Sequence, residues 1–212
     1  MERLELTERS RFVNMLTLAR VPLIAAWMLF ALAEERYGGF ALGFFACAAM
    51  LLSGLTDLWD GWLARRWGVV STFGKLADPL MDKIFYVVAF PTLLWLVTIR
   101  DGASFHSLLL LVFTILYILR DLWVTFMRAV GSVYGAPVAA MTLGKVRTAL
   151  SFPAAGWIYL HVLLSPFASG AAATAWLFSV YFVEVSMTLL NVYSFFSYTR
   201  AYMPYVKKAL EK

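Results

Sequence analysis

The sequence predicts an all-α integral membrane protein with six transmembrane helices, and three observations lead to this fold class. Of the 212 residues, 62% are hydrophobic and only 15% are charged, whereas soluble domains typically hold about 45–50% apolar and about 25% charged residues. The mean hydropathy is +0.75. Apolar segments long enough to cross a bilayer, roughly 20 residues each, recur along the chain. They lack the alternation of a membrane β-barrel, so helices are predicted, and a soluble or disordered domain is excluded.

The six predicted spans use almost the whole chain and leave no room for a separate soluble domain, so residues 1–212 are expected to form a single membrane domain. Leu4, Leu6 and Phe12 lie among the charges of the juxtamembrane segment 1–13, which favours a short amphipathic helix on the membrane surface. In chain order the spans are predicted at 15–33, 40–63, 79–99, 105–130, 146–168 and 171–198.

Lysine and arginine are distributed unequally between the two sides that six spans define. Of the 18 such residues, only Arg36 and Arg100 fall on one side. Because cytoplasmic segments carry the excess of basic residues, both termini are predicted in the cytoplasm, most simply of a bacterial cell with the chain in its inner membrane. The basic residues on the cytoplasmic side are Arg3, Arg9, Arg11, Arg20, Arg65, Arg66, Lys75, Lys83, Arg120, Arg128, Lys145, Arg147, Arg200, Lys207, Lys208 and Lys212.

Four aspartates lie where the second span ends and the third begins, within the segment 53–83. Asp57 and Asp60 close the second span, and Asp78 and Asp82 open the third. Carboxylates near the membrane core are costly, so each needs a partner or a function. Pro79 suits the first turn of the third helix and Asp78 suits its N-cap, and an earlier start of that helix stays open.

Helical geometry gathers these acids on shared faces. Asp78 and Asp82 are four residues apart and therefore lie on one face of their helix. At 100° per residue, two acids, two very small residues and one arginine of the second span share an arc of about 140°. They are Asp57, Asp60, Gly61, Ala64 and Arg65.

Four converging carboxylates repel one another unless some are protonated or divalent metal lies between them. Oxygen ligands with no histidine or cysteine nearby favour Mg²⁺ or Mn²⁺, and four acids suit two ions that clamp the attacking and leaving oxygens of a phosphoryl displacement. Gly61 and Ala64 would admit a bulky group close to the backbone, and Arg65 would bind phosphate oxygens. The alternative is a solvated loop in which the acids pair with Arg65, Arg66, Lys75 and Lys83.

The spacing of these residues resembles the signature of the CDP-alcohol phosphotransferase family. Eight positions match: Asp57, Asp60, Gly61, Ala64, Arg65, Gly74, Asp78 and Asp82. The resemblance implies a six-helix membrane enzyme, usually a homodimer, that displaces CMP from a CDP-linked alcohol with the hydroxyl of a second alcohol.

The resemblance also implies roles for single residues. Asp57, Asp60 and Asp78 would bind metal, and Asp82 would both contact metal and act as the general base. The CDP-alcohol would be bound by Thr56, Gly61, Ala64, Arg65 and Gly74.

Three further segments are similar to those of phosphatidylglycerophosphate synthases. In the first span the similar residues are Asn14, Thr17 and Arg20. The fourth span has Arg120-Asp121-x-x-Val124-Thr125-x-x-Arg128, with Asp121 where that group usually has Glu. The third segment is Gly144-Lys145-Val146-Arg147-Thr148, with Arg147 in place of Lys. This likeness implies CDP-diacylglycerol as donor and glycerol 3-phosphate as acceptor, with membrane lipids but no nucleic acid as partners. The acceptor phosphate would be bound by Arg120, Arg128, Lys145, Arg147 and Thr148.

The basic residues of the fourth and fifth spans independently favour a phosphorylated acceptor. A neutral acceptor such as serine would not need them, although myo-inositol phosphate remains open beside glycerol 3-phosphate. The alternative is that they are ordinary basic residues at a cytoplasmic surface.

A divalent-cation transporter is the alternative from another class of function. It would place acids near the bilayer midplane in broken helices, whereas these four acids lie at span ends.

For Glu184, an acid inside the sixth span, both a functional and a structural role remain open.

Overall fold

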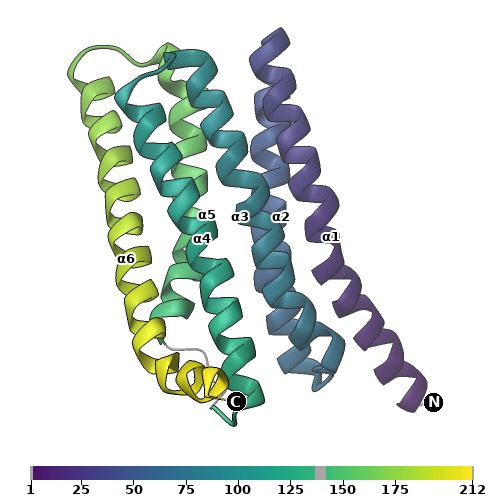
Figure 1. The fold of residues 1–212 in the computed structure, drawn as a ribbon. Helices are drawn as coiled ribbons and strands as arrows, with labels where there is room; N and C mark the ends of the chain where they lie inside the picture. The colour runs from purple at the N-terminus through teal and green to yellow at the C-terminus, as the bar shows by residue number, and fades with distance from the viewer. Residues whose placement is uncertain (1, 137–141, 212) are drawn as a thin grey trace. The chain divides into compact units, whose positions relative to one another are not determined.

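The computed structural model describes residues 2–136 and 142–211, and within them the chain forms six long α-helices (Figure 1). All six are long and apolar enough to cross a membrane, as predicted from composition. The helices are α1 (Glu2–Tyr37), α2 (Phe40–Trp67), α3 (Thr72–Asp101), α4 (Phe105–Val133), α5 (Thr142–Leu164) and α6 (Gly170–Leu210), with a 3-10 turn, η1, at Ser165–Phe167.

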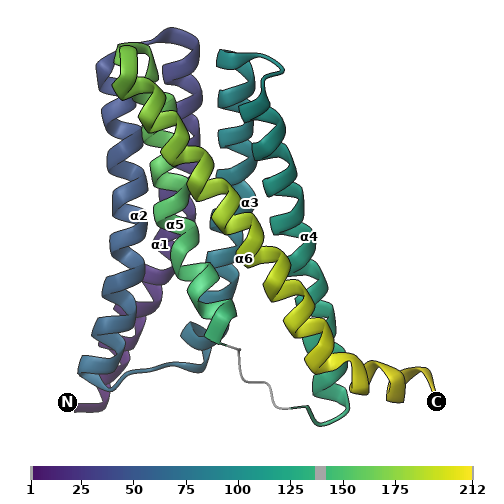
Figure 2. The ribbon, with the colours of Figure 1, turned by 90° about the vertical axis from the view of Figure 1, so that its left-hand side faces the viewer.

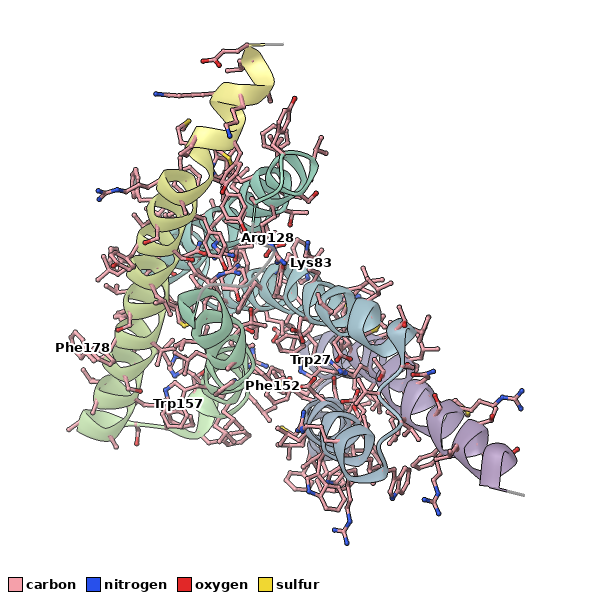
Figure 3. The ribbon with its side chains drawn as sticks, turned by 90° about the horizontal axis from the view of Figure 1, so that it is seen from below. Trp27, Lys83, Arg128, Phe152, Trp157 and Phe178 are labelled. Carbon is pink, nitrogen blue, oxygen red and sulfur yellow. The ribbon has the colours of Figure 1, made fainter. Side chains whose placement is uncertain are left out.

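The chain divides into two compact units, Met1–Thr92 and Leu93–Lys212, which are described separately. The first unit contains α1, α2 and the beginning of α3. The second contains the end of α3 with α4, α5 and α6. Large apolar side chains point outward in both units, for example Leu51 at 63% exposed and Phe178 at 65% (Figure 3), as expected for surfaces that face lipid.

In the first unit, α1 packs along α2 (Figure 1). The buried face of α1 repeats at alternating intervals of four and three residues, the pattern of a helix–helix seam. One end of this seam is apolar, with Trp27 only 1% exposed (Figure 3), whereas the other end contains polar residues of both helices. The buried residues of α1 are Val13, Thr17, Arg20, Ile24, Trp27 and Ala31.

The N-terminal residues do not form a separate surface helix. The segment from Glu2 onward is helical but continues without a break into the first span, so the predicted amphipathic helix over 1–13 is not confirmed.

The third helix begins earlier than Pro79, the alternative that the sequence left open: α3 begins at Thr72, and Pro79 lies inside it. The N-cap is Ser71, whose Oγ accepts a hydrogen bond of 2.9 Å from the Gly74 N–H. The preceding helix ends at Gly68, whose positive φ of 65° permits the reversal of a Schellman motif in which the Val69 N–H donates to the Ala64 carbonyl. The loop is therefore shorter than predicted, and the Asp78 carboxylate is not used as a cap.

In the second unit, α6 packs against both α4 and α5 (Figure 2). Tyr198 and Tyr202 of α6 are buried with residues of α4. Two glycines permit this approach: a Cβ built on Gly131 would lie 2.5 Å from the Tyr202 ring, and one on Gly144 would lie 2.7 Å from the Tyr198 hydroxyl. A larger residue at either glycine would force these helices apart.

Candidate functional site

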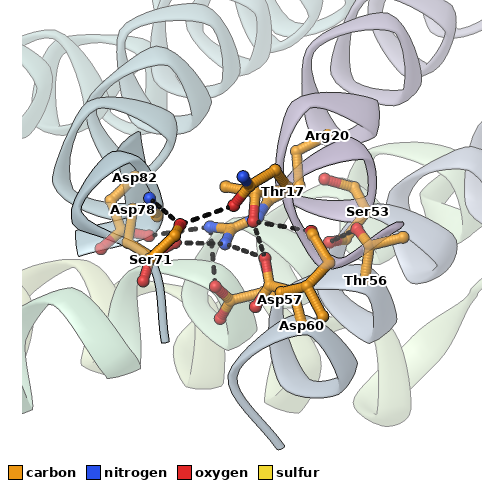
Figure 4. A network of polar contacts seen from close by, with 12 residues as sticks. Thr17, Arg20, Ser53, Thr56, Asp57, Asp60, Ser71, Asp78 and Asp82 are labelled. Atoms are coloured by element: carbon orange, nitrogen blue, oxygen red, sulfur yellow. Dashed lines mark hydrogen bonds and ion pairs between the residues drawn. The ribbon is translucent and has the colours of Figure 1, made fainter. Parts of the chain in front are cut away.

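The four aspartates of the sequence motif converge in the first unit, around a single guanidinium group (Figure 4). Asp57 and Asp60 lie on α2, and Asp78 and Asp82 lie on α3. The guanidinium belongs to Arg20 of α1. The N···O separations are 2.7 Å to Asp57, 2.8 Å to Asp60, 3.5 Å to Asp78 and 3.4 Å to Asp82.

Each terminal nitrogen of Arg20 bridges the two helices that carry the acids. Nη1 contacts Asp57 of α2 and Asp82 of α3, while Nη2 contacts Asp60 of α2 and Asp78 of α3. Charge compensation of this kind is required, because four carboxylates brought together at the ends of apolar helices would otherwise repel one another strongly. The sequence alternative, in which loop cations pair with the acids, did not include Arg20, and the side chain of one of those cations, Lys75, lies outside the described residues.

The aspartates differ in their access to solvent. The Asp60 side chain is only 4% exposed, whereas those of Asp57, Asp78 and Asp82 are 49%, 51% and 37% exposed. The Thr17 hydroxyl donates a hydrogen bond of 2.8 Å to the same Oδ2 of Asp60 that Arg20 contacts. Asp60 is therefore the buried carboxylate of the cluster, and the other three carboxylates lie on its solvent-exposed side.

The donor set fits a hard divalent cation, although no group of three acidic, histidine or cysteine residues in the described part of the chain is arranged as a metal site. Four carboxylates from two helices, with neither sulfur nor imidazole among them, are the oxygen ligands that Mg²⁺ and Mn²⁺ prefer. In this arrangement the cation between them is Arg20, at separations up to 3.5 Å that suit a large planar group.

The next turn of α2 holds the small residues that the motif predicted. The Arg65 guanidinium lies across Gly61, where a Cβ would be 3.3 Å from its Nη1, so glycine permits this position. Ala64 lies on the following turn and is half-buried. The hydroxyl of Thr56 is used within α2, because it donates to the Ser53 carbonyl at 2.8 Å (Figure 4).

Gly74 lies beside a polar pair that joins α1 to the start of α3. The Ser71 hydroxyl donates to Asn14 Oδ1 at 2.8 Å, and a Cβ on Gly74 would lie 3.2 Å from the Ser71 Oγ and 3.6 Å from that Asn14 oxygen. Asn14 and Gly74 were predicted from the sequence but Ser71 was not; its signal was its place just before the helix, where serine is a preferred N-cap.

The second unit holds a buried basic cluster around Arg147. Its side chain is 1% exposed, and its donors reach Asn191 Oδ1 at 2.9 Å, Asp121 Oδ1 at 3.5 Å and the Tyr117 carbonyl at 3.2 Å. Its guanidinium carbon also lies 3.7 Å from the centre of the Tyr117 ring. Through these contacts Arg147 of α5 links α5 to both α4 and α6.

The other predicted phosphate-binding residues have different surroundings. Arg120 donates to Ser194 Oγ, lies 3.9 Å from Asp121 and stacks on Tyr198, with 5.0 Å to the ring centre. Thr148 donates to the Gly144 carbonyl at 3.1 Å. Arg128 is half-buried on α4, and the side chain of Lys145 lies outside the described residues.

The residues of α6 that contact these arginines were not predicted from the sequence. Asn191, Ser194 and Tyr198 are buried on α6 at intervals of three and four residues, and that spacing of polar residues in an apolar span is the signal that could have revealed them. Glu184 lies on the same face and is fully buried, with His106 Nε2 3.0 Å from its Oε1. This contact favours the structural role for Glu184.

Together, six apolar helices and an acidic cluster on two of them define a polytopic membrane protein with a polar centre in which four carboxylates surround one guanidinium. A family model described as CDP-alcohol phosphatidyltransferase matches residues 12–195. The chain belongs to this family of membrane enzymes, whose members generally depend on a divalent metal ion.

The curated relatives have the same name in distant bacteria. The chain is 32% identical over 180 residues to a CDP-diacylglycerol–glycerol-3-phosphate 3-phosphatidyltransferase of Bacillus subtilis (strain 168), covering 79% of this chain and 88% of that protein. It is 29% identical over 190 residues to the protein of that name in Escherichia coli (strain K12), covering 89% of this chain and 94% of the relative.

We expect Arg147→Met to destabilise the protein by about 1–3 kcal/mol, because it leaves the buried Asn191 amide and the Tyr117 carbonyl without their donor and leaves the half-buried Asp121 with only its longer contact to Arg120. Thermal unfolding in detergent would measure the loss. The matched control is Arg200→Met, which removes the same charge from an exposed position on α6. Equal melting temperatures for the two variants would contradict a structural role for Arg147.

Proposed function

We propose that this enzyme transfers the phosphatidyl group of CDP-diacylglycerol to glycerol 3-phosphate, forming phosphatidylglycerophosphate and CMP. The observation that carries the proposal is the convergence of Asp57, Asp60, Asp78 and Asp82 around one cationic group, in the spacing that marks the family. The names of the curated relatives support the choice of donor and acceptor.

In the proposed reaction, the acceptor hydroxyl forms a new bond to the phosphorus that carries the diacylglycerol, and the bond from that phosphorus to the oxygen of CMP breaks. CMP leaves with the electron pair. Asp82 takes the hydroxyl proton as general base. Its position supports this role, because its side chain is 37% exposed and its contact to Arg20 is long, at 3.4 Å.

Asp57, Asp60, Asp78 and Asp82 would hold the divalent metal, Mg²⁺ or Mn²⁺ and most economically two ions. When bound, the metal supplies charge neutralisation for the phosphates and lowers the pKa of the hydroxyl. Asp60 would anchor the site, since Thr17 and Arg20 hold it in a buried position.

The donor would bind along α2 and the start of α3. Arg65 carries its positive charge beside Gly61, where pyrophosphate oxygens could approach the helix closely. Thr56, Ala64 and Gly74 would complete the nucleotide site, and the Asn14–Ser71 pair beside Gly74 offers further polar atoms. The apolar outer faces of the helices suit lateral entry of the lipid chains.

For the acceptor phosphate we propose the basic residues of α4 and α5. Arg120 and Arg128 would contact the phosphate with Lys145. Arg147 has its donors engaged by protein oxygens, so it would contribute charge and hold Asp121, which in turn positions Arg120. Thr148 would complete the site at the start of α5.

We further propose that the enzyme is a homodimer in a bacterial inner membrane, with its active site and both termini in the cytoplasm. The strong bias of lysine and arginine toward one side supports this orientation. Exposed apolar side chains along the helices supply surface that either lipid or a second copy could cover.

An acceptor competition assay tests the proposed function directly. The purified enzyme is given CDP-diacylglycerol, Mg²⁺ or Mn²⁺, and equal amounts of labelled glycerol 3-phosphate, myo-inositol phosphate, serine and glycerol. We expect glycerol 3-phosphate alone to enter lipid, with one CMP released per lipid formed. Preferential incorporation of another acceptor would assign the enzyme to a different branch of the family.

We expect Asp82→Asn to lower kcat by about 10²–10⁴-fold, because the amide keeps the shape of the carboxylate but cannot accept the hydroxyl proton. The rate is measured as CMP release at saturating donor and acceptor. Glu8→Gln, which removes an exposed carboxylate of α1 outside the site, should keep the wild-type rate. Wild-type turnover by Asp82→Asn would rule out Asp82 as the base.

A further inference from the structure

Arg20 occupies a position in α1 that the packing of the helix would otherwise fill with an apolar residue. It lies in the buried seam toward α2, between Thr17 and Ile24, and its side chain is 4% exposed. A guanidinium in an apolar span is costly unless it is paired. The four carboxylates provide that pairing, so Arg20 and the aspartates depend on each other.

The two terminal nitrogens of Arg20 lie at two points between the acids, as two separate cations would. Nη1 and Nη2 each lie between one carboxylate of α2 and one of α3. A two-metal site built from the same four acids would likewise require positive charge at two points between the two helices. The guanidinium therefore contacts one oxygen of each of the four carboxylates that the proposed metal ions would need.

The charge of the cluster makes Arg20 and bound metal competitors for the acids. Four carboxylates and one guanidinium leave a formal charge of about −3, so the cluster attracts more positive charge. Two divalent ions alone would neutralise the four acids, and the guanidinium would then be a surplus cation beside them. Each bound ion therefore weakens the attraction of the carboxylates for Arg20, and Arg20 in turn opposes the binding of metal.

The distances indicate which contacts are the more easily lost. Arg20 lies 2.7 and 2.8 Å from the α2 carboxylates but 3.4 and 3.5 Å from those of α3. The shorter contacts anchor the guanidinium on α2, where Thr17 also holds Asp60. Asp78 and Asp82 of α3 are held less closely and are also more exposed than Asp60.

We propose that Arg20 acts as an internal cation that holds the four aspartates together in the metal-free enzyme and competes with the divalent metal for them. In the metal-free state it keeps α2 and α3 in register for binding. When metal binds, the guanidinium is released from the carboxylates and its charge becomes available to the phosphates of the donor. This inference rests on the proposed role of the four aspartates as metal ligands.

The test is a Mn²⁺ titration of the purified protein without nucleotide or lipid substrate, followed by electron paramagnetic resonance of the free ion. Arg20→Met removes the competing charge but keeps a long side chain. We expect it to bind Mn²⁺ at least about tenfold more tightly than the wild type, because a neighbouring positive charge opposes cation binding. Arg20→Lys keeps the charge but presents one nitrogen instead of two, so its affinity should lie between the two.

Thermal unfolding supplies a second readout that does not depend on turnover. In EDTA, Arg20→Met should melt at a lower temperature than the wild type, since its four carboxylates have lost their shared cation. Saturating Mn²⁺ should close most of that gap. Arg66→Met is the matched control: it removes a charge from an exposed arginine of α2 that stacks on Trp62, and it should change neither the affinity nor the gap.

The possible failures can be told apart. A wild type that binds no Mn²⁺, even with CDP present, would overturn the metal role of the aspartates and this inference with it. A wild type that binds Mn²⁺ while a folded Arg20→Met binds it no more tightly would overturn the inference alone and leave Arg20 as a structural ion pair. If Arg20→Met does not remain folded in EDTA, the same comparison is made with Arg20→Lys, and an affinity equal to that of the wild type counts against the proposal.

Discussion

Four carboxylates at the ends of two apolar helices need positive charge between them, and the first unit is organised around this requirement. Asp57 and Asp60 close α2, Asp78 and Asp82 lie near the start of α3, and Arg20 of α1 reaches all four. Without a cation, their mutual repulsion would separate the helices that carry them. The same need for positive charge supports the proposed binding of metal and phosphate at this cluster.

In the second unit the buried charges are positive, and they too require compensation by groups of other helices. Arg120 and Arg147 are buried among α4, α5 and α6, where Asp121 and the polar side chains of α6 compensate them. The helices pack closely here, because Gly131 and Gly144 bring the tyrosines of α6 against α4 and α5. All three donor nitrogens of Arg147 contact protein oxygens, so the proposed acceptor site gives it a supporting role, whereas Arg120 has fewer protein partners.

The sequence alone predicted the spans and the shared face of the acids, because both depend on local features of a single helix. The number of spans follows from the length of the apolar segments, whereas the gathering of Asp57 and Asp60 and the position of Arg65 beside Gly61 follow from helical spacing. The start of α3 could not be fixed from the sequence, because Pro79 and Asp78 form a plausible cap, while the actual cap, Ser71, lies within the expected loop.

What the sequence could not predict was which residues of different helices meet. Arg20 was a candidate only through its likeness to the first span of related enzymes, and nothing in a linear pattern states that a residue of α1 reaches four acids on α2 and α3. The partners of Arg147 on α6 were missed for the same reason. Pairings of this kind depend on tertiary packing, which fixes the distance between helices far apart in sequence.

The most direct test of the charge requirement is to locate Mn²⁺ in crystals of the enzyme by its anomalous scattering, with a CDP-diacylglycerol analogue bound. We expect Mn²⁺ between α2 and α3, with Asp57, Asp60, Asp78 and Asp82 as its protein ligands and Arg20 withdrawn from the carboxylates. Mn²⁺ bound elsewhere, with Arg20 still joined to all four aspartates in the substrate complex, would contradict both the metal site and the exchange of cations proposed for it.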